Sequence, residues 1–204
     1  MLHYIITFFI FFTIPISSQA KLIIENRTNF SELQENVQKY LLREHLYVST
    51  EIKTTEKIQK LYISANALHQ KSCQKAFKKI SKYENYQNIM EFITESTYDE
   101  KTRMLHFGIS HLLLPYDMIL DFKIDRIKGD GTYYFEFTQG FLRGLTGVIK
   151  VEKFHDKKFS CFVNVEVKWK GPETVIPDAV FELFSQTVME LGIKILWRQS
   201  KHRF

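Results

Sequence analysis

Between residues 92 and 169 apolar and polar side chains alternate over one stretch after another, and this period of two is the feature that most constrains the fold. Successive side chains on a strand point to opposite faces, so the alternation predicts strands with one buried face. The predicted strands cover residues 92–98, 104–110, 117–127, 132–139, 142–154 and 159–169. Short polar or glycine-containing segments separate them, which predicts an antiparallel meander.

A long helix is predicted over residues 177–199, after the last strand. Pro177 suits the first turn of a helix. Apolar side chains then recur every three or four residues, at Val180, Phe184, Val188, Leu191 and Ile195. The helix would be about 33 Å long. Its apolar stripe needs a partner, and we expect this partner to be the buried face of the sheet.

The first part of the chain alternates between helical and extended patterns. Ser31 and Gln34 are spaced as in a capping box, and they predict a helix to about residue 43. Strands are predicted over residues 46–53 and 58–65, followed by an amphipathic helix over residues 68–82. One side of that helix is apolar, with Cys73, Ala76, Phe77 and Ile80. The opposite side is basic, with Lys71, Lys75, Lys78 and Lys82.

The order of these elements predicts an α+β fold in which a curved antiparallel sheet wraps around a long C-terminal helix. With 204 residues, of which 45% are hydrophobic, the chain can bury one sizeable core. Its 18 Phe and 10 Tyr residues exceed what a small core needs. We therefore expect either an aromatic core or a cavity lined with rings between sheet and helix.

The first twenty residues resemble a signal peptide. Residues 4–16 form an apolar run that is short for a membrane span, and small residues stand at Ser18 and Ala20. Cleavage near Ala20 would release an exported protein, either periplasmic or secreted. An uncleaved anchor and a buried strand are the alternatives. The predicted organisation is a signal peptide at 1–20, an N-terminal helical extension at 21–45 and one domain at 46–204.

Cys73 and Cys161 are too few for a disulfide framework or a zinc site. The sequence favours two small buried side chains. A single disulfide in an oxidising compartment is the alternative, because sequence does not show whether the two positions meet.

Three stretches resemble the START-like (SRPBCC) superfamily, the polyketide cyclase and coenzyme-Q-binding class with a helix-grip fold. Residues 57–91 resemble its first strand, its helix and its Y-x-x-Y turn, here Tyr83 and Tyr86. Residues 137–147, FTQGFLRGLTG, resemble a strand-turn-strand segment of some members, and residues 176–198 resemble the terminal helix. The resemblance covers residues 45–200. It implies a hydrophobic ligand, such as a lipid, sterol, quinone or polyketide, held in a cavity between sheet and helix.

The candidate ligand-binding residues come from the predicted inner face of the sheet and from the long helix. Arg143 falls on the same side as Leu145 by alternation, where a buried guanidinium would need an anionic or carbonyl partner. A bulge at Gly140 or Gly144 would instead turn it outward. The Tyr133 hydroxyl would orient a ligand. The full set is Leu120, Phe122, Tyr133, Phe135, Phe137, Arg143, Leu145, Trp169, Phe184 and Val188.

The sequence favours a binding or carrier protein over an enzyme. No inward-facing carboxylate or histidine emerges from the alternation, so no catalytic residue, metal ligand or cofactor is assigned. An aromatase or cyclase using the same cavity, and a protein-interaction module with a filled core, are the alternatives. The lysine face of residues 71–82 is most simply a solvated helix face, and with the net charge of +5 an anionic membrane surface is the alternative as a second partner. Nucleic acid is not expected, and we expect a monomer.

Overall fold

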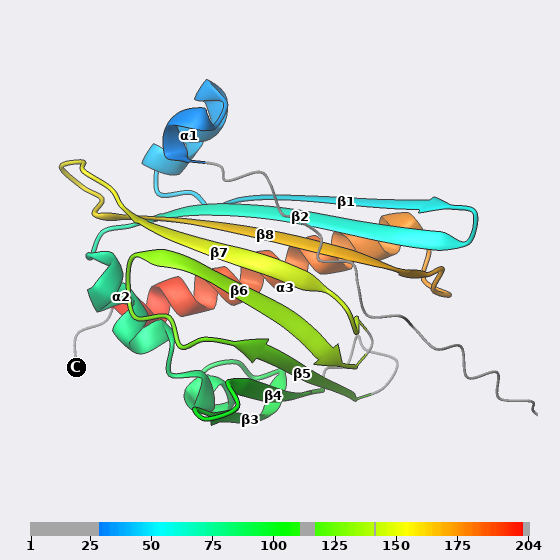
Figure 1. Cartoon of the computed structure of the whole chain (residues 1–204). Helices are drawn as coiled ribbons and strands as arrows, with labels where there is room; N and C mark the ends of the chain where they lie inside the picture. Colours follow the sequence, from blue (N-terminus) through cyan, green and yellow to red (C-terminus); the bar gives the residue numbers. More distant parts are fainter. Residues whose placement is uncertain (1–28, 111–116, 141, 202–204) are drawn as a thin grey trace, which may run out of the picture.

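The computed structural model describes residues 29–110, 117–140 and 142–201 of the chain. The predicted signal peptide at 1–20 and residues 21–28 of the predicted extension lie outside the described residues. An 8-stranded antiparallel sheet has the order β1-β2-β8-β7-β6-β5-β4-β3 (Figure 1). Its strands are β1 (Tyr47–Thr55), β2 (Ile58–His69), β3 (Ile93–Asp99), β4 (Met104–Ile109), β5 (Met118–Ile124), β6 (Gly131–Gln139), β7 (Thr146–Lys153) and β8 (Cys161–Pro172). The meander predicted from the alternation is confirmed.

The helices are α1 (Glu35–Leu42), α2 (Cys73–Ile80) and α3 (Asp178–Lys201), with short 3-10 helices η1 (Phe30–Glu32) and η2 (Tyr83–Asn88). Figure 1 shows the long helix α3 running behind the sheet, along the strands from β1 toward α2. This arrangement confirms the predicted α+β helix-grip fold. Within the described ranges, no helix has both the length and the apolar composition needed to cross a membrane.

The core lies between α3 and the face of the sheet that it covers, which we call the inner face. Near the start of α3, Phe181 packs among Ile52, Leu61, Val167 and Trp169. Near its end, Leu196 and Trp197 pack on a cluster to which α2 and the start of β8 contribute. These side chains come from alternate strand positions, as expected for a sheet with one face toward the core.

Helix α1 packs on the other face of the sheet. Val37 and Leu41 are buried against Leu68, Phe159 and Phe162, so the helix predicted to about residue 43 is confirmed as an element. Its predicted start is not. The capping box is formed by Asn29 and Glu32 around η1, where the Asn29 N–H donates to the Glu32 carboxylate at 2.9 Å, and α1 itself begins at Glu35.

The two cysteines form a disulfide, which corrects the favoured interpretation of free, buried side chains. Cys73 at the start of α2 is bonded to Cys161 at the start of β8, 88 residues later, with their Cα atoms 5.0 Å apart. Both residues are buried in the cluster that also contains Ala76 and Phe77. The bridge ties the start of α2 to the start of β8. The sequence did not reveal this contact, because it depends on the position of β8 in the folded sheet.

The β1–β2 hairpin turns on residues that are poorly suited to it, and we predict that their replacement stabilises the protein. Thr55 pairs with Ile58, so Glu56 and Lys57 form a two-residue turn with φ of 53° and 62°. Such turns favour Asn-Gly, because other side chains are strained at positive φ. Glu56→Asn with Lys57→Gly should raise the free energy of unfolding by about 1 kcal/mol, measured by guanidinium denaturation. Lys60→Gly, in the adjoining strand, should lower it by a similar amount.

Candidate functional site

Aromatic rings from neighbouring strands meet on the inner face of the sheet. Phe122 of β5 pairs with Phe137 of β6, and their rings stack 5.0 Å apart at 21°. Phe107 of β4 meets Phe122 edge-on at 5.3 Å, and Phe135 lies 6.3 Å from Phe137. Phe122, Phe135 and Phe137 are only half-buried. Three of the predicted rings, Phe122, Phe135 and Phe137, are thus brought together here, with part of their apolar surface open.

Gly147 determines where the Phe135 ring lies. The two residues are paired across β6 and β7, and a Cβ atom added at Gly147 would be 2.2 Å from the ring. Only glycine allows this close approach. The Phe135 ring therefore extends over Gly147 of β7, and it packs against both the Trp169 cluster and the cluster at β3–β5.

The apolar row predicted on α3 is not the stripe that packs on the sheet. Its first four members remain exposed: Val180 56%, Phe184 38%, Val188 41% and Leu191 46%. The sheet is instead contacted by Phe181, Met189 and Leu196 on the adjoining stripe. Neighbouring residues on a helix are about 100° apart, so a helix with two apolar stripes can bury either one. The prediction that this row is buried against the sheet is therefore wrong.

The exposed row nevertheless runs beside the aromatic strands. Ile195 continues the row by four residues and packs on the cluster of β3–β5, together with Leu120 and Phe122. Residues spaced in this way share one side of a helix, so the row lies along the flank of α3 next to those strands. The carboxylates of Asp178 and Glu182 reach β1 instead, where they accept from the backbone of Thr54 and Ile52. The exposed row of α3 and the half-buried rings therefore form an apolar surface.

The remaining apolar candidates lie in or beside the core. Leu145 and Trp169 are 3% and 6% exposed and pack with Phe181. Leu120 is half-buried beside the rings. The Tyr133 hydroxyl donates to the Gly129 carbonyl at 3.1 Å. It therefore serves the turn before β6, and the structure gives it no free role in orienting a ligand.

Arg143 is exposed, which corrects the alternation argument that placed it on the inner face. Residues 142–144 form a turn before β7, in which the Arg143 N–H donates to the Gly140 carbonyl and Gly144 has φ of 83°. Arg143 therefore lies outside both strands, and the alternation of side chains along a strand does not determine where it points. Its carbonyl accepts from the Trp169 indole N–H at 3.2 Å, so its backbone anchors the turn to the core.

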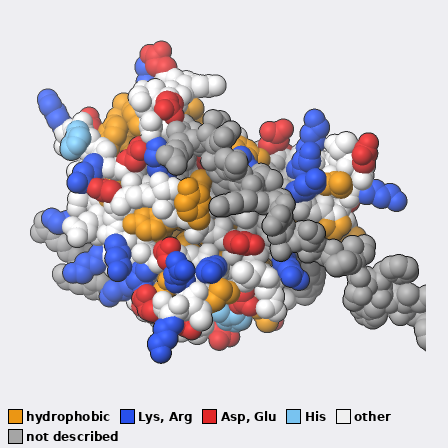
Figure 2. Space-filling view, in the orientation of Figure 1, with side chains coloured by type: hydrophobic (Ala, Val, Ile, Leu, Met, Phe, Trp, Pro, Cys, Tyr) orange, Lys and Arg blue, Asp and Glu red, His pale blue; other side chains and the backbone are white. Residues whose placement is uncertain are grey.

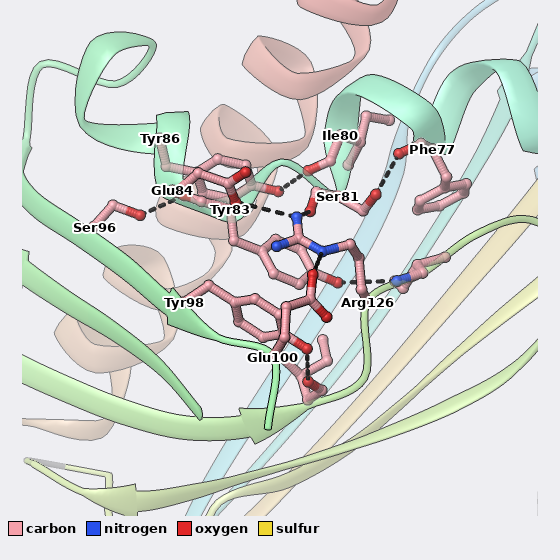
Figure 3. Close-up of polar contacts among 12 residues, drawn as sticks. Phe77, Ile80, Ser81, Tyr83, Glu84, Tyr86, Ser96, Tyr98, Glu100 and Arg126 are labelled. Atoms are coloured by element: carbon pink, nitrogen blue, oxygen red, sulfur yellow. Dashed lines mark hydrogen bonds and ion pairs between the residues drawn. The ribbon is translucent and has the colours of Figure 1, made fainter. Parts of the chain in front are cut away.

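Sequence reasoning missed a polar centre that is built around Arg126 (Figure 3). Its guanidinium lies 4.5 Å from the Tyr98 ring centroid and 5.6 Å from that of Tyr83. It pairs with Glu100 at 2.5 Å and with Glu84 at 3.1 Å, and it donates to the Ser81 carbonyl. Arg126 thus joins η2 to the turn after β3. The only sequence signal was the Y-x-x-Y spacing of Tyr83 and Tyr86.

The hydrogen bonds of this centre are satisfied, which makes it structural. The Tyr86 hydroxyl donates to the Ile80 carbonyl at 2.7 Å, and that of Tyr83 donates to the Asp125 carbonyl at 3.1 Å. Burial raises the pKa of both phenols, so they stay neutral and act as donors. Burial lowers the pKa of Arg126, but its contacts with Glu100 and Glu84 outweigh this and raise it.

Replacing Arg126 should destabilise the fold. Arg126→Ala removes the ion pairs and the ring contacts and leaves the Ser81 carbonyl without this donor, so we expect a loss of about 2–3 kcal/mol in the free energy of unfolding. Arg103→Ala is the matched control. Its ion pair with Asp125 is 52% exposed on both sides, and its loss should change stability by less than about 0.5 kcal/mol. Equal effects in thermal or chemical denaturation would contradict the assignment.

A buried serine–histidine pair is also structural. The Ser200 hydroxyl lies 2.7 Å from Nε2 of His69, and Nδ1 of the same ring accepts the Lys71 N–H at 2.9 Å. Since Nδ1 is an acceptor, Nε2 carries the proton, and the Ser200 hydroxyl in turn donates to the Trp197 carbonyl at 2.8 Å. The ring therefore cannot take a proton from Ser200 as a catalytic base would.

The lysine face of α2 is exposed except at one end. Lys75, Lys78 and Lys82 are exposed, while Lys71 is half-buried and donates to the Ser200 carbonyl at 2.5 Å. The opposite side of the helix is buried, as predicted. Figure 2 shows blue side chains gathered over the part of the surface where Figure 1 places α2.

A comparison with protein-family models finds no match, and neither does a comparison with curated proteins. Solved structures do match. A START superfamily protein from Mycobacterium smegmatis has a TM-score of 0.54 at 11% identity and covers 69% of this chain and 97% of its own. Ara h 8.0201 has a TM-score of 0.53 at 14% identity, covering 69% and 97%.

The fold is START-like. A further START-like match, the di-domain ARO/CYC StfQ from the steffimycin biosynthetic pathway, has a TM-score of 0.55 at 8% identity and covers 70% of this chain and 49% of its own. These likenesses confirm the resemblance to the START-like superfamily at the level of fold. Helix α3 corresponds in place to the helix that gives the helix-grip arrangement its name.

Proposed function

We propose that this protein binds or carries a hydrophobic small molecule between the aromatic strands β4–β6 and the exposed flank of α3. One observation carries the proposal. The longest helix of the described chain keeps an apolar row of Val180, Phe184, Val188 and Leu191 at 38 to 56% exposure, beside rings that are only half-buried. Such apolar surfaces on adjoining elements mark a binding site more often than a solvated face.

The energy for binding comes from covering this surface. A large apolar side chain contributes about 1.5–3 kcal/mol when it is fully buried, and several are available here. A lipid, sterol, quinone or polyketide-like molecule fits this requirement. The START-like fold supports the proposal, since a START superfamily protein and an aromatase/cyclase have the same architecture.

The geometry favours binding over cyclase chemistry. A cyclase needs an acid or base beside its substrate, and the carboxylates that α3 brings to the sheet are engaged at β1. The hydroxyl of Tyr133 is engaged in a turn.

Export is part of the proposal. The apolar run of residues 4–16 and the small residues before Lys21 support cleavage near Ala20. The Cys73–Cys161 disulfide supports it independently, because such bonds persist in oxidising compartments. The mass of the protein recovered outside the cytosol should correspond to a chain that begins at Lys21; a full-length chain retained in the cytosol would contradict export.

The second partner that we propose is an anionic membrane surface. Lys75 and Lys78 of α2, and Lys82 just after it, are exposed, and each is worth about 1 kcal/mol near an anionic bilayer. Lys71 is excluded from this surface by its bond to Ser200. Binding to phosphatidylglycerol vesicles should weaken with salt and with Lys75→Glu and Lys78→Glu together; unchanged binding would remove this partner.

Native mass spectrometry of the exported, detergent-free protein tests the ligand directly. We expect a stoichiometric added mass that solvent extraction releases as a hydrophobic molecule. A protein that is apo as purified and stays apo after incubation with a membrane lipid extract would overturn the proposal.

A further inference from the structure

A hollow of about 830 Å³ lies at the β1 edge of the sheet. It is on the opposite side of α3 from the exposed apolar row of Val180, Phe184, Val188 and Leu191. It is bounded by α1, the start of β1, the end of β2 and the second half of α3. Figure 1 shows α1 above the end of the sheet where β1 begins. We call this hollow the edge groove and define it by Tyr40, Val48, Ile193, Lys194, Trp197 and Arg198. Its volume lies within the range of about 300–1,000 Å³ of small-molecule sites.

The floor of the edge groove is apolar. Val48 of β1 and Ile193 of α3 line it, and the Trp197 ring forms one side. The indole N–H of Trp197 donates to the Leu68 carbonyl at 3.0 Å. Tyr40 forms part of the rim, where its ring stacks on His45 at 4.5 Å. The floor can therefore hold a hydrocarbon body, with rings on two sides.

The edge groove is lined by two carboxylates, Glu44 and Glu190, and by two cations, Lys194 and Arg198. Glu190 is paired with Lys194 at 2.9 Å, and Lys194 and Gln186 lower the pKa of its carboxyl by donating hydrogen bonds to it. Glu44 is paired with Lys158 at 2.5 Å. Arg198, one turn beyond Lys194, has no ion pair or hydrogen bond to the residues that the structure describes. Its guanidinium is open to an anion at the end of the apolar floor.

The edge strand adds a backbone donor and acceptor. The amides of Ile52 and Thr54 point away from β2 and reach Glu182 and Asp178. Alternate residues of an antiparallel strand direct their backbone groups to the same side. The N–H and C=O of Val48 therefore also point outward, at the edge that the groove borders.

We infer that the edge groove is a second binding site, for a single-chain amphiphile with one anionic head, a carboxylate or a phosphate. The hydrocarbon chain lies on Val48, Ile193 and Trp197, and the head pairs with Arg198, with Lys194 next to it. The requirement for both parts follows from the groove itself, because its apolar floor ends at Arg198, which has no ionic partner among the described residues. This inference does not depend on the proposed function, which concerns the opposite flank of α3.

Calorimetric titration of the full exported chain with dodecanoate and with dodecyl phosphate, both below micelle formation, tests the inference. Arg198→Ala should weaken binding about tenfold, the effect of losing one charged hydrogen bond. Ile193→Trp, which fills the floor, should abolish it. Arg103→Ala removes an arginine elsewhere and should leave binding unchanged. Inorganic phosphate should not bind without a chain, and neutral dodecyl maltoside should bind at least about tenfold more weakly than dodecanoate.

Two results would overturn the inference. The first is equal affinity in the Arg198→Ala and Ile193→Trp variants and the unchanged protein. The second is binding only to phosphatidylglycerol vesicles, with none to soluble dodecanoate, since the groove is sized for one whole molecule. Phe184→Asp with Val188→Asp separates the two sites, because it should remove the ligand of the proposed function and leave dodecanoate binding at the edge groove intact.

Discussion

Phe184→Asp combined with Val188→Asp should empty the protein of its hydrophobic ligand and leave its stability nearly unchanged. Both side chains are already about 40% exposed, at 38% and 41%, so the fold loses little when they become polar. A ligand covering them would instead meet two carboxylates that it must desolvate. We expect at least a hundredfold loss of affinity, equivalent to about 3 kcal/mol, measured as bound mass in native mass spectrometry.

Ala179→Asp is the matched control for this prediction. Ala179 is an exposed position on α3 that lies off the row, and an acidic residue is favourable in the first turn of a helix. It should retain full occupancy. If the double variant also kept its ligand, the flank of α3 would not be the binding surface.

Loss of the disulfide should destabilise the protein strongly. The Cys73–Cys161 bond closes a loop with a sequence separation of 88, and the chain-entropy estimate for such a loop is about 4–5 kcal/mol. Cys73→Ala with Cys161→Ala should therefore lower the free energy of unfolding by about 4 kcal/mol, mainly because the unfolded chain gains freedom. Guanidinium denaturation with and without a reductant measures the effect.

The reductant supplies the control within the same experiment. Reduction should bring the unchanged protein close to the double variant, while the double variant itself should not respond. An unchanged protein whose denaturation midpoint is insensitive to full reduction would show that the bridge contributes little.

Local patterns were enough to predict the strands of the meander and their order within it, but not the pairing of β2 with β8. Alternation such as Val163, Val165 and Val167 against Asn164 and Glu166 reports a strand directly, because side chains on a strand take opposite sides in turn. Short polar connections then leave hairpins as the simplest pairing. The long helix over residues 177–199, and the α+β helix-grip fold that follows from it, were predictable for the same reason.

The candidate site was predictable only in part. Phe122, Phe135 and Phe137 do meet on the inner face, because their strand positions have the right parity. Arg143 does not join them, because glycines at 140 and 144 end the alternation in a turn. Tyr133 lies on the expected strand, yet a local bond occupies its hydroxyl.

What the sequence by itself determined is the set of elements and their apolar faces, since these depend on neighbours along the chain. The tertiary structure alone decided which stripe of α3 is buried, whether Cys73 meets Cys161, and which partners Arg126 finds. These contacts join residues far apart in sequence, and packing chooses among stripes and pairs that local periodicity leaves equivalent. The same packing leaves the flank of α3 exposed and opens the edge groove beside β1.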